Sequence, residues 1–327
     1  MEELRKKIKQ YGKKIKEVKR EVHKGLVGQD EIIDSVLTCM ICNGHVLLES
    51  VPGLAKTLLV RLLTETVEEA KFQRIQFTPD LLPTDITGTT VYEEKRGFYT
   101  LKGPIFANFV LGDEINRAPP KVQSAMLQAM EEGVVTIGKE TYQLPKPFIV
   151  LATQNPLEQK GVYPLALAQI DRFLFKIFVD YPSEEDEILI LNQNAQIKKI
   201  DEFGIKKVLR PQELIEMQEC VKAIRISEEV KEYIVDIINA TRYPQEYGVE
   251  EGKYVTWGAS PRATIGLSLA AKATAMIKGR TFVIPNDVRD IAHHVLRHRL
   301  VLNYEGKARG ISADDIVDSL IDHVPVH

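Results

Sequence analysis

The residues of this chain best suited to chemistry are Lys56 and Thr57, which follow a short Pro/Gly turn. The apolar run before the turn predicts a strand, and the leucine-rich run after it predicts a helix. In that context the loop's N–H groups and the first helical turn point at one concavity, Lys56 adds a positive charge, and Thr57 offers a hydroxyl for magnesium. The segment therefore predicts a phosphate-binding loop. The residues assigned to the nucleotide are Val51, Pro52, Gly53, Leu54, Ala55, Lys56, Thr57 and Leu58.

The loop does not match the pattern G-x-x-x-x-G-K-[ST] completely, because Ser50 and Ala55 stand where glycines are usual. A serine adopts a positive φ less readily than a glycine, so we expect Ser50 to weaken nucleotide binding without abolishing it. For this segment taken alone, an ordinary strand-to-helix turn with a surface lysine stays open as the alternative.

Two adjacent acids, Asp113 and Glu114, close an apolar strand further along the chain. An acid at this place can hold Mg²⁺, and its neighbour can orient and deprotonate an attacking water. Acids at helix starts are also common caps, so the pair by itself does not indicate a metal site. It does so because a phosphate-binding loop precedes it in the chain. The sequence predicts Thr57 and Asp113 as magnesium ligands and Glu114 as the base.

Three more polar residues occupy positions where they could reach a phosphate. Asn155 follows the apolar run 148–153 and can touch the γ-phosphate or the attacking water, although an asparagine before a proline is also an ordinary turn residue. Arg172 opens the last predicted strand and can stabilise transition-state charge, or it forms a surface pair with its neighbouring acid. Arg262 follows a Ser-Pro helix start that would hold it rigidly on the first turn, with a solvent-facing arginine as the alternative.

Elements that could position these residues alternate between strand and helix over residues 25–180, which predicts a parallel sheet with helices on its faces. Ligands bind at the carboxyl ends of such strands, where these residues stand. Strands are predicted at 72–77, 105–111, 148–153 and 173–179, a helix at 121–132, and hairpins at 89–101 and 134–144. Helical patterns dominate after residue 182. We therefore predict a nucleotide-binding core over 1–182, including an N-terminal helix, and a helical domain over 183–327.

Composition is typical of a globular protein, with 44% hydrophobic and 27% charged residues. The net charge of −3 gives no basic excess of the kind that nucleic-acid binding favours. No apolar run is long enough to span a membrane, and the charged N-terminal segment lacks the apolar core of a signal peptide, so a cytoplasmic location is expected. Three cysteines do not suggest a disulfide framework.

Over nearly its whole length the chain resembles the MoxR family of AAA+ ATPases. The order and spacing of six motifs carry this resemblance. They are Val27-Gly28-Gln29, Val51 to Thr57, Asp113-Glu114-Ile115-Asn116-Arg117-Ala118-Pro119-Pro120, Ala152-Thr153-Gln154-Asn155-Pro156, Asp171-Arg172-Phe173 and Gly258-Ala259-Ser260-Pro261-Arg262.

The resemblance implies a fold, an α/β P-loop AAA+ core whose parallel sheet is flanked by helices, followed by a C-terminal all-α lid domain. It implies an insert at residues 78–103 and a hairpin at 134–144. It also implies ATP and Mg²⁺ as ligands and ATP hydrolysis as the activity. The roles that it implies are Walker A for Lys56 and Thr57, Walker B for Asp113 and Glu114, sensor 1 for Asn155, a trans arginine finger for Arg172, sensor 2 for Arg262, and adenine contacts for Gly28 and Gln29.

The chain departs from the family pattern after Tyr163-Pro164-Leu165, where the family usually reads Pro-Glu-Ala-Gln and this chain places Leu167 in the position of the acid. We expect a subunit-interface or nucleotide-sensing contact to be absent there. The family suggests a homo-oligomeric ring, a hexamer by analogy, that works as a chaperone with a von Willebrand factor A-domain protein on a client. A nucleic-acid motor and a non-hydrolysing nucleotide-binding scaffold are the alternatives, and the pairing of Lys139 with Glu140 on the second hairpin disfavours the motor.

Overall fold

The computed structural model describes residues 2–51, 53–95, 97–156, 161–193 and 199–326. Pro52, one of the predicted nucleotide-binding residues, lies outside them. The chain forms two compact units, which we call the core unit (Lys14–Phe173 and Ile177–Ile215) and the lid unit (Met1–Lys13, Leu174–Lys176 and Glu216–His327). The predicted domain boundary at residue 182 stays a prediction.

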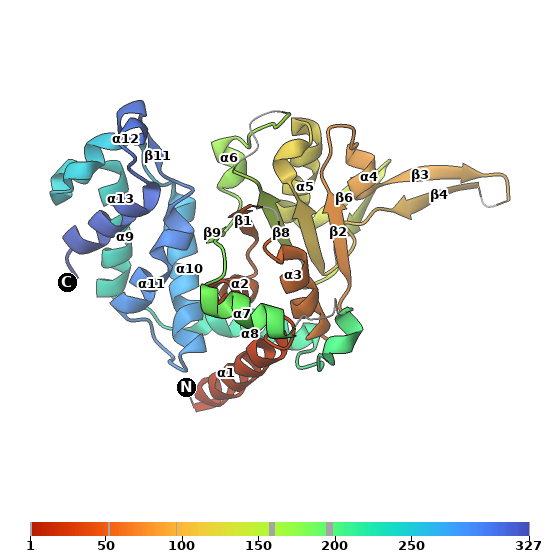
Figure 1. The fold of residues 1–327 in the computed structure, drawn as a ribbon, viewed down its shortest axis with the longest axis horizontal. Helices are drawn as coiled ribbons and strands as arrows, with labels where there is room; N and C mark the ends of the chain where they lie inside the picture. Colours follow the sequence, from red (N-terminus) through yellow and green to blue (C-terminus); the bar gives the residue numbers. More distant parts are fainter. Residues whose placement is uncertain (1, 52, 96, 157–160, 194–198, 327) are drawn as a thin grey trace. The chain divides into compact units, whose positions relative to one another are not determined.

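The predicted parallel sheet is confirmed as a five-stranded sheet in the order β2-β5-β8-β1-β9 (Figure 1). The pairs β1–β8, β5–β8 and β2–β5 are parallel. The strand order places β8 between the strand before the phosphate-binding loop and the strand that ends in the two acids. The bounds of the strands are β1 Val46–Ser50, β2 Phe72–Gln76, β5 Phe109–Asp113, β8 Ile149–Gln154 and β9 Phe175–Val179.

The predicted strand at 105–111 begins later, at Phe109, because the chain from residue 103 to residue 108 turns instead of pairing. The side chain of Asn108 stabilises this turn with two hydrogen bonds. Its side-chain amide donates to the carbonyl of Pro147 over 3.0 Å, and its side-chain oxygen accepts from the N–H of Lys71 over 3.1 Å. The apolar residue Ile105 is buried, but as part of the core rather than of the sheet.

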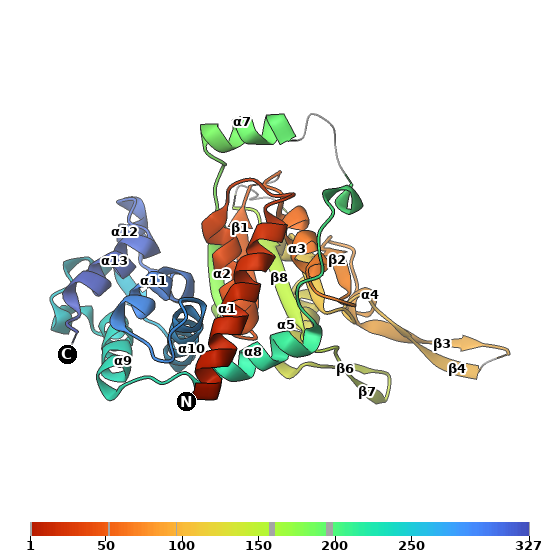
Figure 2. The same cartoon turned by 90° about the horizontal axis from the view of Figure 1, so that it is seen from below.

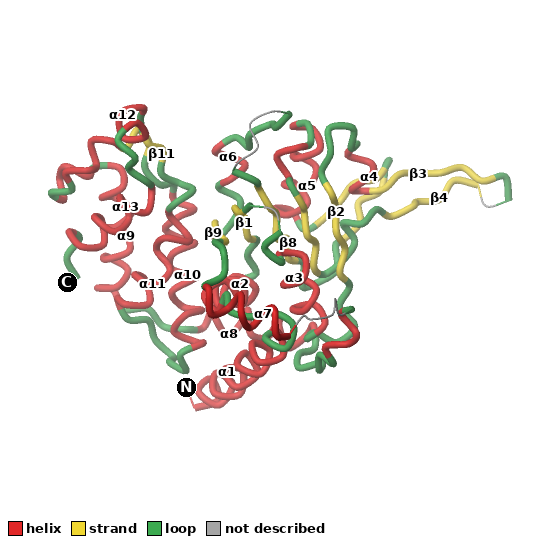
Figure 3. The backbone as a smooth tube through the Cα atoms, in the orientation of Figure 1, coloured by secondary structure: helices red, strands yellow, loops and turns green. Residues whose placement is uncertain are grey.

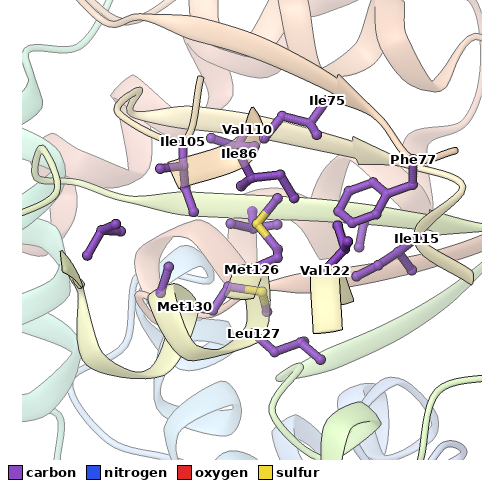
Figure 4. Close-up of a cluster of buried hydrophobic side chains, with 14 of the residues drawn as sticks. Ile75, Phe77, Ile86, Ile105, Val110, Ile115, Val122, Met126, Leu127 and Met130 are labelled. Carbon is purple, nitrogen blue, oxygen red and sulfur yellow. The ribbon is translucent and has the colours of Figure 1, made fainter. Parts of the chain in front are cut away.

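The inner strands β5, β8 and β1 of the sheet are buried on both faces, as expected where helices cover a parallel sheet. One face packs on α5 through a cluster that includes Val110 of β5 and Met126 of α5 (Figure 4). The neighbouring residues Phe109 and Leu111 point to the other face and are also fully buried. From the N-terminus to residue 223, the described helices and short helical segments are α1 Glu2–Val22, α2 Asp30–Ile41, α3 Lys56–Glu65, α4 Pro83–Thr87, η1 Ile115–Arg117, α5 Pro120–Glu132, α6 Leu167–Ile170, α7 Glu184–Gln193, η2 Ile200–Phe203 and α8 Pro211–Ala223.

Both predicted hairpins form, and they extend from the sheet of the core unit (Figures 1 and 2). The first is β3 (Gly88–Glu93) with β4 (Gly97–Lys102), and it carries an exposed aromatic pair, Tyr92 and Phe98. The second is β6 (Val134–Ile137) with β7 (Glu140–Gln143). A hydrogen bond of 2.8 Å between the hydroxyls of Thr100 and Tyr142 joins the two hairpins.

The lid unit is mostly helical, in contrast to the alternating core unit (Figure 3). It also contains a small antiparallel pair of strands, β10 and β11. No helix among the described residues is both long and apolar enough to cross a membrane. The elements of the lid unit after α8 are α9 Glu228–Arg242, η3 Pro244–Tyr247, η4 Glu250–Tyr254, β10 Val255–Trp257, α10 Pro261–Ile277, α11 Pro285–Leu296, β11 Val301–Leu302, α12 Tyr304–Ala308 and α13 Ala313–His323.

A buried histidine, His45, links β8 and α5 in the core unit. Its Nδ1 accepts a hydrogen bond of 3.0 Å from the N–H of Val150, so the proton of the neutral ring is on Nε2, which lies 3.1 Å from the carbonyl of Met130. Burial lowers the pKa of His45 to about 4, because the charged imidazolium loses its hydration there.

We predict that His45 makes stability depend on pH. The unfolded chain protonates this histidine near pH 6.5 and the folded chain near pH 4, so its contribution to the free energy of unfolding is complete above about pH 6.5 and falls as the pH drops towards 4. Between pH 7 and pH 5 the wild-type protein should lose about 2 kcal/mol more than His45→Gln in urea unfolding. The exposed His323→Gln is the control, and equal losses in the wild type and His45→Gln would contradict the prediction.

Candidate functional site

The predicted phosphate-binding loop lies between β1 and α3, and its lysine folds back onto the loop. Lys56 Nζ donates to Ser50 Oγ over 2.6 Å and to the carbonyl of Val51 over 3.0 Å. Burial lowers the pKa of Lys56, and the charges of Asp113 and Glu114 act in the opposite direction. The structure therefore brings the predicted lysine within electrostatic reach of both predicted acids.

The strained residue of this loop is Ala55, and the positive φ expected at Ser50 is absent. The expected effect of Ser50 on nucleotide binding stays a prediction. Ser50 is the last residue of β1 and has no positive φ, so a serine fits there without strain, and its hydroxyl contacts Lys56. Ala55 is the N-cap of α3 and has the left-handed values φ 51° and ψ 19°, which are unfavourable for a residue with a Cβ. Because Ala55 supplies no side-chain cap, the first N–H groups of α3 face the loop, as an anion site requires.

The two acids are held by a threonine on the neighbouring strand. The hydroxyl of Thr153 donates to Asp113 Oδ1 over 2.7 Å and accepts from the N–H of Glu114 over 2.8 Å. Thr153 is almost fully buried, so these hydrogen bonds are shielded from water. Glu114 has φ 58°, a strained value for a non-glycine residue, and the bond to Thr153 supports it there.

Side chains of β2 and of η1 complete the surroundings of the acids. Gln76 Nε2 donates to Glu114 Oε2 over 3.0 Å, and Arg117 Nη1 lies 3.0 Å from the same oxygen. Arg74 donates to Asp113 Oδ2 through Nε at 3.1 Å and Nη2 at 2.5 Å. Gln76 and Arg74 share one face of β2, which pairs with β5, so the sheet register brings them to the acids.

Sequence reasoning missed Arg74 and Gln76 as site residues. The alternation of the predicted strand places both on one face, but this pattern does not reveal that β2 pairs with β5 or in which register. Thr153 and Arg117 stood inside recognised motifs without an assigned role. Their place within two or three residues of Asn155 and Glu114 was the signal that the sequence offered.

Asn155 follows β8 directly and is buried. The neighbouring Gln154 pairs with Glu49 of β1, and Ala152 pairs with Gly112 of β5. Asn155 therefore lies at the edge of the sheet between the phosphate-binding loop and the acids, where its prediction requires it.

The predicted adenine contacts, Gly28 and Gln29, form the tight turn before α2. Both have positive φ, 65° for Gly28 and 56° for Gln29. A Cβ at Gly28 would stand 2.4 Å from the carboxylate of Asp186 on α7, so a larger residue there would require that carboxylate to move. The start of α7 therefore packs directly on this turn.

A cavity of about 700 Å³ lies beside α3, lined by Thr57, Leu58, Arg61, Glu65, Phe72, Lys199, Ile200 and Asp201.

The two predicted arginines lie in different units. Arg172 of the core unit precedes the fully buried Phe173, and its Nη2 is 3.0 Å from Glu131 Oε2 on α5. Arg262 of the lid unit stands in the first turn of α10, and its N–H donates over 3.2 Å to Ser260, the predicted N-cap. Gly258 packs against α9 so closely that a Cβ would meet the carbonyl of Thr241 at 2.4 Å. This close contact explains the glycine that opens the Gly-Ala-Ser-Pro-Arg sequence.

Leu167, which stands where the family usually has an acid, opens α6 and is 53% exposed. An apolar side chain at this position cannot make the ionic contact that a carboxylate would make. The expected loss of an interface contact stays a prediction.

The oxygen atoms at the site suit a magnesium ion, since carboxylate and hydroxyl oxygens are ligands that Mg²⁺ prefers. Asp113 presents a carboxylate at the end of β5, and Thr57 follows Lys56, whose charge interacts with Asp113. The residues present therefore fit the predicted metal.

Comparisons with known proteins agree with this geometry. Residues 45–175 match the profile of the "ATPase family associated with various cellular activities (AAA)", and residues 250–320 match the profile of the AAA lid domain. A solved structure of a protein from Cytophaga hutchinsonii, provisionally described as an ATPase, superposes with a TM-score of 0.92 at 45% identity, over 98% of this chain and 97% of the other.

Relatives that align with 92–93% of this chain narrow the assignment from a domain class to a protein family. The chain is 46% identical over 306 residues to Chaperone MoxR1 of Mycobacterium tuberculosis, covering 93% of this chain and 80% of the relative. It is 43% identical to the protein YeaC of Bacillus subtilis, over 93% and 92% of the two chains, and 30% identical to Protein MoxR of Paracoccus denitrificans, over 92% and 93%.

An AAA domain that contains the predicted phosphate-binding loop, followed by an AAA lid domain, defines the class of this protein as an AAA+ ATPase. Within that class the chain belongs to the MoxR family, as its sequence motifs predicted.

We predict that Ala55→Gly stabilises the protein. Glycine adopts the left-handed conformation without strain, and this gain exceeds the added entropy of the unfolded chain. The free energy of unfolding should rise by about 0.5–1 kcal/mol in chemical denaturation. Ala125→Gly, in the middle of α5, is the matched control and should instead lower it by about 1 kcal/mol. A loss of stability in both variants would contradict the strain assigned to Ala55.

We also predict that the hydroxyl of Thr153 is needed at the acids. Thr153→Val keeps the shape of the side chain but leaves Asp113 Oδ1 and the Glu114 N–H without this partner, so the free energy of unfolding should fall by about 1–3 kcal/mol. Thr153→Ser retains the hydroxyl and should behave like the wild type apart from the lost methyl group. Equal unfolding free energies for the serine and valine variants would refute this role.

Proposed function

We propose that this protein hydrolyses ATP at the interfaces of a homo-oligomeric ring and uses the energy to remodel or mature a client protein. The observation that carries the proposal is the convergence of Lys56, Asp113 and Glu114 at the carboxyl edge of the sheet, with Thr153 joining the two acids. This arrangement combines a phosphate-binding cation, a metal-binding carboxylate and a base in one place.

The chain's own residues would divide the work as follows. The N–H groups of the loop Val51 to Leu58 and the ammonium of Lys56 would bind the phosphates. Asp113 and Thr57 would hold Mg²⁺, which supplies neutralisation of the phosphate charge when bound. Glu114 would accept the proton of the attacking water, and Asn155 would orient that water or the γ-phosphate.

The hydrogen bonds around Glu114 bear directly on its role as a base. Gln76 and Arg117 both contact Oε2, so two side chains hold the same carboxylate oxygen. A base must lie within hydrogen-bond reach of the proton that it abstracts. These two contacts would set the orientation of the carboxylate, while Thr153 fixes the backbone at Glu114.

The remaining predicted residues complete the proposal. Gly28 and Gln29 would border the adenine at the turn against α7. Arg172 would act as the arginine finger on the nucleotide of the neighbouring subunit, and Arg262 as sensor 2. A site completed in trans makes hydrolysis depend on assembly, which is the argument for a ring. The family analogy favours a hexamer.

The client-directed part of the proposal rests on the relatives. One relative with 46% identity is named a chaperone, and it covers most of this chain. The MoxR resemblance adds a von Willebrand factor A-domain protein as partner, and the sequence alone led us to expect the cytoplasm as location. Both stay predictions. The acidic Glu140 next to Lys139 on the β6–β7 hairpin gives no support to a nucleic-acid motor.

We predict that Glu114→Gln binds ATP but releases phosphate at least about 100-fold more slowly than the wild type, because the amide cannot accept the proton of the attacking water. Phosphate release and the binding of a fluorescent ATP analogue are measured on the same preparations. Glu132→Gln, on the exposed surface of α5, is the control that should keep wild-type turnover. Equal background release from the wild type and Glu114→Gln would instead support the non-hydrolysing scaffold.

A further inference from the structure

Arg172, the proposed arginine finger, contacts an acid that none of the motifs includes. Its Nη2 lies 3.0 Å from Oε2 of Glu131, near the C-terminal end of α5. Both residues belong to the core unit. The contact uses one of the five N–H donors of the guanidinium, so a guanidinium held in this way still has donors for a phosphate oxygen.

Each member of the pair is adjacent in sequence to a residue of the same hydrophobic cluster. Phe173 follows Arg172 and is fully buried. Met130, which is labelled in Figure 4, precedes Glu131 and is 7% exposed. The backbone at Arg172 is held further by its N–H, which donates to the carbonyl of Gln169 over 3.3 Å. The core therefore fixes the distance between the two backbones, and the ion pair has only to fix the orientation of the long arginine side chain.

The exposure of the ion pair indicates that it contributes little to the stability of the fold and serves mainly to orient the side chain of Arg172. The side chains of Arg172 and Glu131 are 30% and 41% exposed, and an ion pair at that exposure contributes about 0–1 kcal/mol to folding. An arginine side chain, by contrast, has many rotamers, and restricting them before the phosphate arrives reduces the entropy lost in the transition state.

We propose that Glu131 is the positioning residue of the arginine finger and holds the guanidinium of Arg172 where it meets the nucleotide of the adjacent subunit. This inference rests on the proposed trans action of Arg172. Because Glu131 acts through Arg172, its effect should appear only in the subunit that donates the finger.

The test uses two kinds of subunit with different tags, co-expressed and purified through both tags. The finger donor carries Glu114→Gln and keeps Arg172. The site donor carries Arg172→Ala and keeps Glu114. Each kind alone should be inactive, and together they should hydrolyse ATP wherever a donor's Arg172 meets an intact site.

Glu131→Gln is then added to one kind of subunit at a time. In the finger donor it should lower phosphate release of the mixture about tenfold, because a displaced catalytic group loses up to about 100-fold in rate. In the site donor it should change nothing, because that subunit has no Arg172 for Glu131 to hold. Glu131→Asp in the finger donor should restore part of the rate, and Glu132→Gln there should leave it unchanged.

The outcomes separate the inference from the proposed function. If the unmodified mixture is inactive while the wild type is active, Arg172 does not act in trans, and both proposals fall. If the mixture is active and Glu131→Gln in the finger donor keeps or raises the rate, Glu131 does not position the finger. Equal losses in the finger donor and the site donor would show a structural role in the subunit and would also overturn the inference.

Discussion

The candidate site depends on one hydroxyl group between two parallel strands. Thr153 of β8 donates to the carboxylate of Asp113 and accepts from the N–H of Glu114, and it does so on a buried inner strand of the sheet. The strand order puts β8 next to both β5 and β1, so the same strand carries Asn155 to the phosphate-binding loop. Because parallel strands end at one edge, fixing β8 fixes the spacing of the acids, the polar amide and the loop.

Backbone strain is concentrated around this edge. Five non-glycine residues have a positive φ within the part of the chain that the structure describes, and three of them belong to the candidate site, namely Gln29, Ala55 and Glu114. Each lies at a sharp change between two elements, where the chain must turn within one or two residues. Such strain persists only where surrounding contacts hold it, and at Glu114 the hydrogen bond from its N–H to Thr153 is one such contact.

Particular elements show how far the sequence could predict the fold. The hairpins and the helix at 121–132 were found within one or two residues, because turn glycines and helical spacing are local signals. The strand predicted from Ile105 was placed too early, because buried apolar residues look alike whether they pair in a sheet or fill a core. The strain assigned to Ser50 belongs to Ala55, because a loop's φ values depend on how its ends are anchored.

The sequence by itself determined the motifs, the order of the elements and the family, since these reside in residue types and spacing along the chain. Only the tertiary structure decided that Arg74 and Gln76 reach the acids, that Ser50 contacts Lys56 and that Glu131 holds Arg172. Strand order and register create the contacts of Arg74 and Gln76, and they depend on pairing between segments far apart in the chain, which local periodicity does not encode.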